Sequence, residues 1–113
     1  MKMITAFIKP HKLMDVTTAL HQVKWLSGAS VSDVRGFGRG RAKEAPDKIL
    51  YETLDYLPRV RLEVACEDEM VDWVVSIIES KSHTGLRGDG KIYVSTLDQA
   101  VRISTGERGV SAI

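Results

Sequence analysis

The chain has a single cysteine, no long apolar run and almost no net charge, and each of these features argues against a class of protein. Cys66 is the only cysteine, so no disulfide can form within the chain, and its inward place in an alternating strand makes it a core residue. No run of about 18 apolar residues occurs, and the start, MKMI, lacks a secretory-signal pattern. The formal charge of +1 makes no case for a nucleic-acid binder. We expect a cytoplasmic protein with no membrane insertion.

What is present fits one small domain. The chain has 113 residues, of which 43% are apolar, so it is long enough for one hydrophobic core and too short for two. We therefore expect a single domain over residues 1–113. Because acidic and basic residues nearly balance, any recognition of an anion must be local.

Four strands are expected, at residues 3–8, 29–36, 59–66 and 91–95. The third is the clearest, because RVRLEVAC alternates between polar and apolar residues. One helix is expected between the first and second strands, and another between the third and fourth. The first helix follows Pro10 and extends to near Gly28, and the second follows acidic residues 67–69, where the helix dipole favours negative charge. Their apolar faces comprise Leu13, Val16, Leu20 and Val23 in the first, and Met70, Val71, Val74, Ile77 and Ile78 in the second.

The order βαββαβ is that of the α+β ferredoxin-like fold. In that fold two helices cover one face of a four-stranded antiparallel sheet. The other sheet face is left bare, so it must be covered by another chain or carry a binding function. Trp25 and Trp73 fall at helical positions and are expected to pack rather than to serve as ligand platforms.

Residues 84–94, TGLRGDGKIYV, carry the strongest functional pattern. The glycines let backbone amides approach an anion closely, and Arg87 and Lys91 supply positive charge, so a phosphate chain is the obvious ligand. The stretch is not a Walker loop, because Lys91 begins an apolar run that favours a strand. The alternative is an ordinary Gly-Asp-Gly hairpin turn. A second such stretch, residues 34–41 (VRGFGRGR), favours the anion-binding interpretation, since both loops could face one ligand.

These stretches resemble the PII signal-transduction family, the nitrogen regulatory proteins of the GlnB and GlnK type. Almost the whole chain is covered in order, by residues 1–4, 8–13, 36–39, 57–60, 84–85, 88–92, 101–103 and 105–107. The resemblance implies a homotrimer with its sheets inward and an adenine nucleotide, ATP, ADP or AMP, bound between subunits. It also implies that residues 38–55 form the T-loop, which contacts a target protein. We expect that target to be a membrane transporter or a component of nitrogen or carbon metabolism.

The resemblance assigns binding roles residue by residue. The phosphates would be held by Gly38, Arg39, Gly88, Asp89, Gly90 and Lys91, with Arg102 assisting, and Gly36 would also belong to the nucleotide site. Ser30 and the strand backbone around Ala65 would line the adenine side. No catalytic residue and no protein ligand for a metal is implied.

Three departures from the family pattern limit these roles. Gly40 replaces a glutamine that helps many members bind Mg²⁺ and 2-oxoglutarate, so we do not expect 2-oxoglutarate to be sensed in the usual way, while binding of Mg²⁺ stays open. Ser104 stands where many members have the second arginine of Arg-x-Arg, which would weaken triphosphate binding or favour ADP or AMP. Glu52 occupies the usual position of the modified tyrosine.

Two other functions fit the same fold. An acylphosphatase-type enzyme needs an asparagine, which this chain lacks, and His11, His21 and His83 are scattered along the sequence. An RNA-recognition motif would share residues 35–38, RGFG, but aromatic residues for base stacking do not follow, and aromatics make up only 6% of the chain. The charges of residues 38–55 could equally be plain solvation of a loop.

Overall fold

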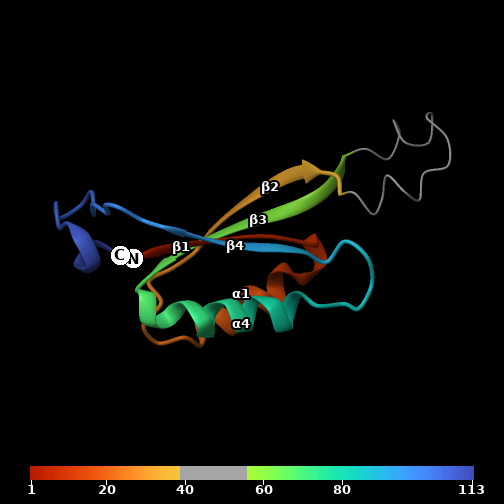
Figure 1. The fold of residues 1–113 in the computed structure, drawn as a ribbon, viewed down its shortest axis with the longest axis horizontal. Helices are drawn as coiled ribbons and strands as arrows, with labels where there is room; N and C mark the ends of the chain where they lie inside the picture. Colours follow the sequence, from red (N-terminus) through yellow and green to blue (C-terminus); the bar gives the residue numbers. More distant parts are fainter. Residues whose placement is uncertain (39–55) are drawn as a thin grey trace.

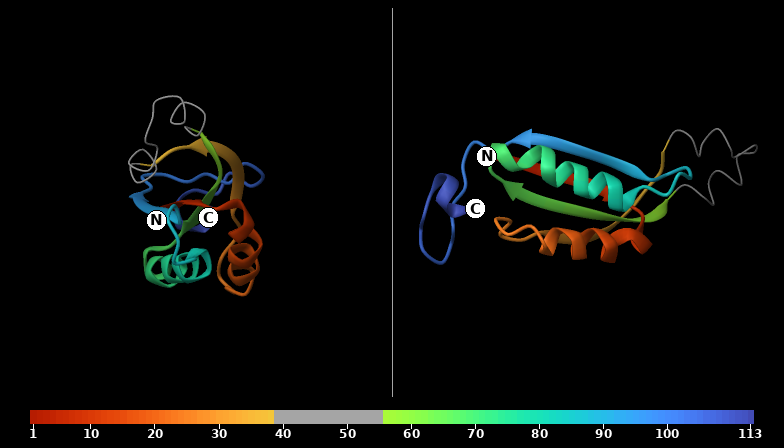
Figure 2. Two further views of the ribbon diagram at one scale, coloured as in Figure 1. Left: turned by 90° about the vertical axis from the view of Figure 1, so that its right-hand side faces the viewer. Right: turned by 90° about the horizontal axis from the view of Figure 1, so that it is seen from below.

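The computed structural model describes residues 1–38 and 56–113. These residues form one sheet of strands in the order β2-β3-β1-β4, with every neighbouring pair antiparallel. The strands are β1 (Lys2–Ile8), β2 (Ser30–Gly36), β3 (Leu57–Cys66) and β4 (Gly90–Thr96), and the helices are α1 (Leu13–His21) and α4 (Val71–Ser82). Both helices lie on the same face of the sheet (Figures 1 and 2). The α+β ferredoxin-like prediction is therefore confirmed.

The core lies between the helices and the central strands. Pairing of Ile4 with Val64 and of Ala6 with Leu62 places these residues on the helix-facing side, where all four are almost completely buried. The same layer contains Ile8, Val16, Leu20, Val60, Cys66, Val74 and Ile78. The expected core position of Cys66 is confirmed, and burial raises the pKa of its thiol.

The opposite face of the sheet carries no helix among the described residues. This face carries both aromatic and charged side chains: the Phe7 and Tyr93 rings meet edge to face at 6.2 Å, and Arg61 forms an ion pair with Glu63 at 3.0 Å. Tyr93 is 53% exposed. The bare face predicted from the order of elements is present, with apolar area still open to contact.

The prediction for the first helix was wrong at its end. α1 stops at His21, and the chain continues in tight turns, in which Val23 N–H donates to the Leu20 carbonyl at 3.0 Å and Leu26 N–H to the Val23 carbonyl at 3.2 Å. Val23 still reaches the interior, so the apolar spacing alone did not distinguish a helix from a turn. The prediction that the tryptophans pack was also wrong, because Trp25 is 75% exposed and Trp73 is 53% exposed.

The remaining boundaries agree within two residues. Pro10 begins a short 3-10 turn that leads into α1, and a second turn, Asp68–Met70, precedes α4. Within residues 1–38 and 56–113, no helix combines the length and the hydropathy that crossing a membrane requires.

Candidate functional site

The glycine-rich loop of residues 83–89 joins the end of α4 to the start of β4. Gly90 pairs with Ile8 at the end of β1, and Ile8 also pairs with Val60 near the start of β3, so the loop lies at this end of the sheet (Figure 1). The hairpin alternative is wrong, because a helix and not a strand precedes the loop. The prediction of a loop that leads into a strand is confirmed.

The backbone of the loop and of its junction with β4 requires glycine at Gly85, Gly88 and Gly90, which all have positive φ angles. Gly88 has φ +79°, and Gly90 has φ +112°, in the region that side-chain-bearing residues rarely adopt. A Cβ atom at Gly90 would lie 1.7 Å from the carbonyl oxygen of Phe7, which is backbone and cannot turn away. The loop is therefore seated directly on the end of β1.

The carboxylate of Asp89 holds the loop together from inside. Its Oδ2 accepts the N–H groups of Thr84 at 2.9 Å and Gly85 at 3.3 Å, and its Oδ1 accepts the Thr84 hydroxyl and lies 3.2 Å from Lys9 Nζ. His83 Nδ1 lies 3.5 Å from Oδ2. The hydrogen bonds from the Thr84 hydroxyl and backbone, followed by those from Lys9 and Gly85, hold the pKa of Asp89 well below its ordinary value.

Positive charge surrounds this end of the sheet. A Cβ atom at Gly88 would lie 2.8 Å from Arg59 Nη2, so the guanidinium of Arg59 sits directly against the loop backbone, while its Nη1 donates to the Pro58 carbonyl at 2.8 Å. Lys91 follows at the exposed start of β4, and Arg87 belongs to the loop itself. Backbone amides, glycines and cations at one place suit an anion such as a phosphate.

Sequence reasoning gave no role to Lys9, Arg59 or Thr84. A usable signal was present: Lys9 directly follows β1 and Arg59 lies near the start of β3, and the ends of these two strands meet beside Gly90 in the sheet. Finding them needed the strand register, which the sequence pattern left open.

Ser30 and Ala65 lie toward the opposite end of the sheet. Ala65 pairs with Met3, five positions along β1 from Ile8, which puts it about 17 Å from the Gly90 position at the strand rise of roughly 3.4 Å per residue. Both residues line a cleft of about 640 Å³. The same cleft is bordered by Met3, Ser27, Gly28, Ala29, Glu63, Leu97, Gln99, Ala100, Val101, Ala112 and Ile113.

Arg102 belongs to the C-terminal segment at this same end (Figure 1). A bridge between Val101 and Arg108 closes a small hairpin, in which Arg102 N–H donates to the Glu107 carbonyl at 2.9 Å. The Arg102 guanidinium lies 3.7 Å from the Glu107 carboxylate, and both side chains are more than two-fifths exposed. Arg102 is therefore fixed far from the glycine-rich loop of its own chain.

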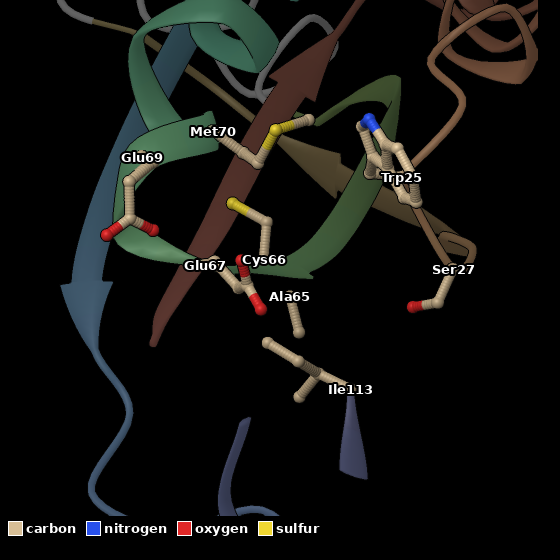
Figure 3. Close-up of a pocket in the computed structure, with 8 residues that line it drawn as sticks. All are labelled: Trp25, Ser27, Ala65, Cys66, Glu67, Glu69, Met70 and Ile113. Carbon is tan, nitrogen blue, oxygen red and sulfur yellow. The ribbon is translucent and has the colours of Figure 1, made fainter. Parts of the chain in front are cut away.

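A second cleft of about 510 Å³ adjoins the first, sharing Ser27, Ala65 and Ile113 with it. Trp25 lies on one side of this cleft and Glu69 on the other, with Cys66 and Met70 between them (Figure 3). Within residues 1–38 and 56–113, no three His, Cys, Asp or Glu side chains gather closely enough to hold a metal ion.

The structure thus divides the predicted site residues into two groups. Gly88, Asp89, Gly90 and Lys91 lie at the loop end, where Gly36 ends β2 and Gly38 follows it. Ser30, Ala65 and Arg102 lie at the opposite end. Arg39 and most of residues 38–55 lie outside the described residues. One chain does not bring the two groups together.

The described residues form a four-stranded ferredoxin-like sheet with a cationic, glycine-rich loop at one end. The family model for nitrogen regulatory protein P-II matches residues 1–107. Nitrogen regulatory protein P-II of Cereibacter sphaeroides is 44% identical to this chain and that of Azospirillum brasilense 42%, while GlnK of Escherichia coli K12 is 38% identical. Each alignment spans 113 residues and the full length of both chains. The chain belongs to the nitrogen regulatory protein P-II family.

Proposed function

We propose that this P-II family member is a regulator that binds an adenine nucleotide between copies of the chain in a homotrimer. The bound nucleotide, ATP, ADP or AMP, sets the state of residues 38–55, which a target protein reads. The target would be a membrane transporter or a component of nitrogen or carbon metabolism. The protein catalyses no reaction of its own, in keeping with relatives that are named as regulatory proteins.

The separation of the two residue groups carries this proposal. The loop end offers cations and glycine backbone that suit phosphates, while the opposite end offers the 640 Å³ cleft and Arg102. A nucleotide that uses both needs the loop end of one copy beside the C-terminal end of another. The open sheet face, which carries Phe7 and the half-exposed Tyr93, supports such an assembly, because exposed aromatic surface is favourable to bury between chains.

Calorimetry and light scattering test the proposal together. Titration of the purified protein with ATP, ADP and AMP should give binding to at least one of them, and the scattering mass should be that of a trimer. The absence of binding with all three nucleotides would overturn the nucleotide proposal. A stable monomer that binds ATP at full affinity would overturn the arrangement between copies.

The ligand set needs its own experiment because Gly40 offers no side chain. We expect 2-oxoglutarate to add little to ATP affinity, with or without Mg²⁺, since a ligand can shift a conformational equilibrium only by its differential affinity for the two states. Strong synergy between ATP and 2-oxoglutarate would show that other residues replace the missing glutamine.

The output through residues 38–55 is testable by deletion. Removal of residues 42–48 should leave the trimer and nucleotide binding intact while abolishing capture of the target. Pull-downs with the full chain and the deleted form, each with and without nucleotide, make the comparison. Undiminished capture by the deleted form would move the output surface elsewhere.

A further inference from the structure

We propose that Asp89 is a positioning residue, which shapes the anion-binding loop from inside and contacts neither the phosphates nor Mg²⁺. The inference rests on the proposed nucleotide function and changes the role of one residue in it. Asp89 lies within the GDGK run, where position in the motif suggests a direct ligand. The geometry of the carboxylate points to a different role.

The acceptor capacity of the carboxylate is already used. An ionised carboxylate offers about four lone-pair sites. Oδ1 meets the Thr84 hydroxyl and Lys9 Nζ, and Oδ2 meets the N–H groups of Thr84 and Gly85, with His83 Nδ1 close by. A magnesium ion would have to displace these donors, and a phosphate would find no donor on an ionised carboxylate, which only accepts hydrogen bonds.

The Thr84 hydroxyl completes the arrangement. It donates to Asp89 Oδ1, accepts from Lys9 Nζ at 3.2 Å and accepts from Leu86 N–H at 3.0 Å, which is the full capacity of a hydroxyl group. Lys9 is only 13% exposed at its side chain, so it neutralises Asp89 inside the loop. The pair therefore adds little net charge to the surface that a phosphate meets.

This arrangement divides the loop into an inner and an outer part. The N–H groups of Thr84, Gly85 and Leu86 are bound within the loop, by Asp89 and by the Thr84 hydroxyl. The ligand is therefore received by an outer part that consists of the backbone of Gly88 and Gly90 with the side chains of Lys91 and Arg59. The Asp89 carboxylate ties this part to Thr84 and Gly85 and so holds its backbone in place.

Two variants separate a positioning role from a ligand role. Thr84→Val removes the hydroxyl and leaves the carboxylate, whereas Asp89→Asn removes the charge and leaves the shape. If Asp89 positions the loop, both variants weaken ADP binding by about tenfold or more, the loss expected for a charge-assisted hydrogen bond, and by the same factor in Mg²⁺ and in EDTA. Thr84→Ser, which keeps the hydroxyl, retains affinity within about threefold.

The matched control is His83→Ala. His83 also faces Asp89, but its side chain is 73% exposed and its nitrogen lies 3.5 Å away, so affinity should change by less than about twofold. An Asp89→Asn defect seen only in Mg²⁺, or full ADP affinity in Thr84→Val, would overturn the proposal.

Amide hydrogen exchange tests the loop without any nucleotide. The amides of Thr84, Gly85 and Leu86 should be protected in the wild-type protein and should exchange faster in Asp89→Asn, while β1 and β3 amides remain unchanged. This result distinguishes the two proposals: failure of the wild type to bind nucleotide would reject the function, whereas equal protection of these amides in both proteins would reject the positioning role.

Discussion

The two ends of the sheet differ in how well their side-chain contacts are shielded from solvent. At the loop end, one chain supplies a complete local structure, with an internal carboxylate, a nearly buried lysine and a glycine seated on the Phe7 carbonyl. At the C-terminal end, the contacts are exposed: Ile103 is 98% exposed, and the pair of Arg102 and Glu107 lies in solvent. The loop end is held by contacts that are largely shielded from water, whereas the C-terminal hairpin is held by a bridge between Val101 and Arg108 and by contacts that stay open to solvent.

Glycine substitutions should show the largest contrast between the two ends. Gly90→Ala places a Cβ atom 1.7 Å from a backbone oxygen in a positive-φ conformation, so it should destabilise the fold by about 2–5 kcal/mol. Gly106 also has a positive φ, +75°, but a Cβ atom there would meet no heavy atom of a non-adjacent residue within 4 Å, so Gly106→Ala should lose only about 1–2 kcal/mol. Urea denaturation of the three proteins measures the difference. Equal losses would show that the contact with Phe7 relaxes.

Charge removal should give the next largest contrast, in nucleotide affinity. Lys91→Ala deletes a cation at the preformed loop and should weaken binding by about 1.5–3 kcal/mol, or ten- to a hundredfold. Arg102→Ala should weaken it less, because Arg102 is already paired with Glu107 and only assists at the site. Calorimetry with ATP and ADP compares the two. A larger loss for Arg102→Ala would make the C-terminal end the main phosphate contact.

Acid pH should affect the loop end selectively. The folded-state pKa of Asp89 is lowered from its ordinary value of 3.8, so the stability contributed by this carboxylate is fully present above that value and is lost as pH falls toward the folded pKa. The stability advantage of the wild type over Asp89→Asn should stay constant from about pH 7 to pH 5 and shrink below about pH 4.

Denaturant midpoints of the two proteins across this range provide the measurement. Asp15→Asn is the control, since the Asp15 side chain is 60% exposed and its ion pair with Lys12 is long, at 3.8 Å, so that stability should change by less than about 0.5 kcal/mol. An Asp89 advantage that persists unchanged at pH 3 would contradict the assignment of the hydrogen bonds.

The smallest effect is expected at the exposed pair of the C-terminal hairpin. Glu107→Gln removes one charge from a contact of 3.7 Å between side chains that are 44% and 43% exposed, so the free energy of unfolding should fall by less than about 0.5 kcal/mol. Thermal denaturation at low and high salt checks this. A loss above about 1 kcal/mol would mean that the hairpin is held by its charges and not by its backbone hydrogen bonds.

The sequence predicted the fold well because its patterns are local. Alternation in residues 59–66 and the stripe of Met70, Val74 and Ile78 specify a strand and a helix without reference to the rest of the chain. The end of α1 could not be predicted in this way, because Val23 is buried from a turn with the same spacing that a helix would give.

The site was predictable only where a motif lies in one segment. The composition of residues 84–91 predicts a glycine-rich, cationic loop, but the pairing of the Asp89 carboxylate with Lys9 could not be predicted, because Lys9 is distant in sequence and comes close only in the folded sheet. Arg59 likewise reaches Gly88 from another strand. Long-range register, which one sequence does not specify, decides which side chains complete the loop.

Phe7 contacts both the glycine-rich loop end and the open face of the sheet. Its carbonyl oxygen lies beneath Gly90, while its ring meets Tyr93 on the open face of the sheet. A displacement of this one residue therefore moves the floor of the loop and the surface available to a neighbouring chain together. Occupation of the loop and association of chains would then be linked in free energy, each strengthening or weakening the other by the same factor.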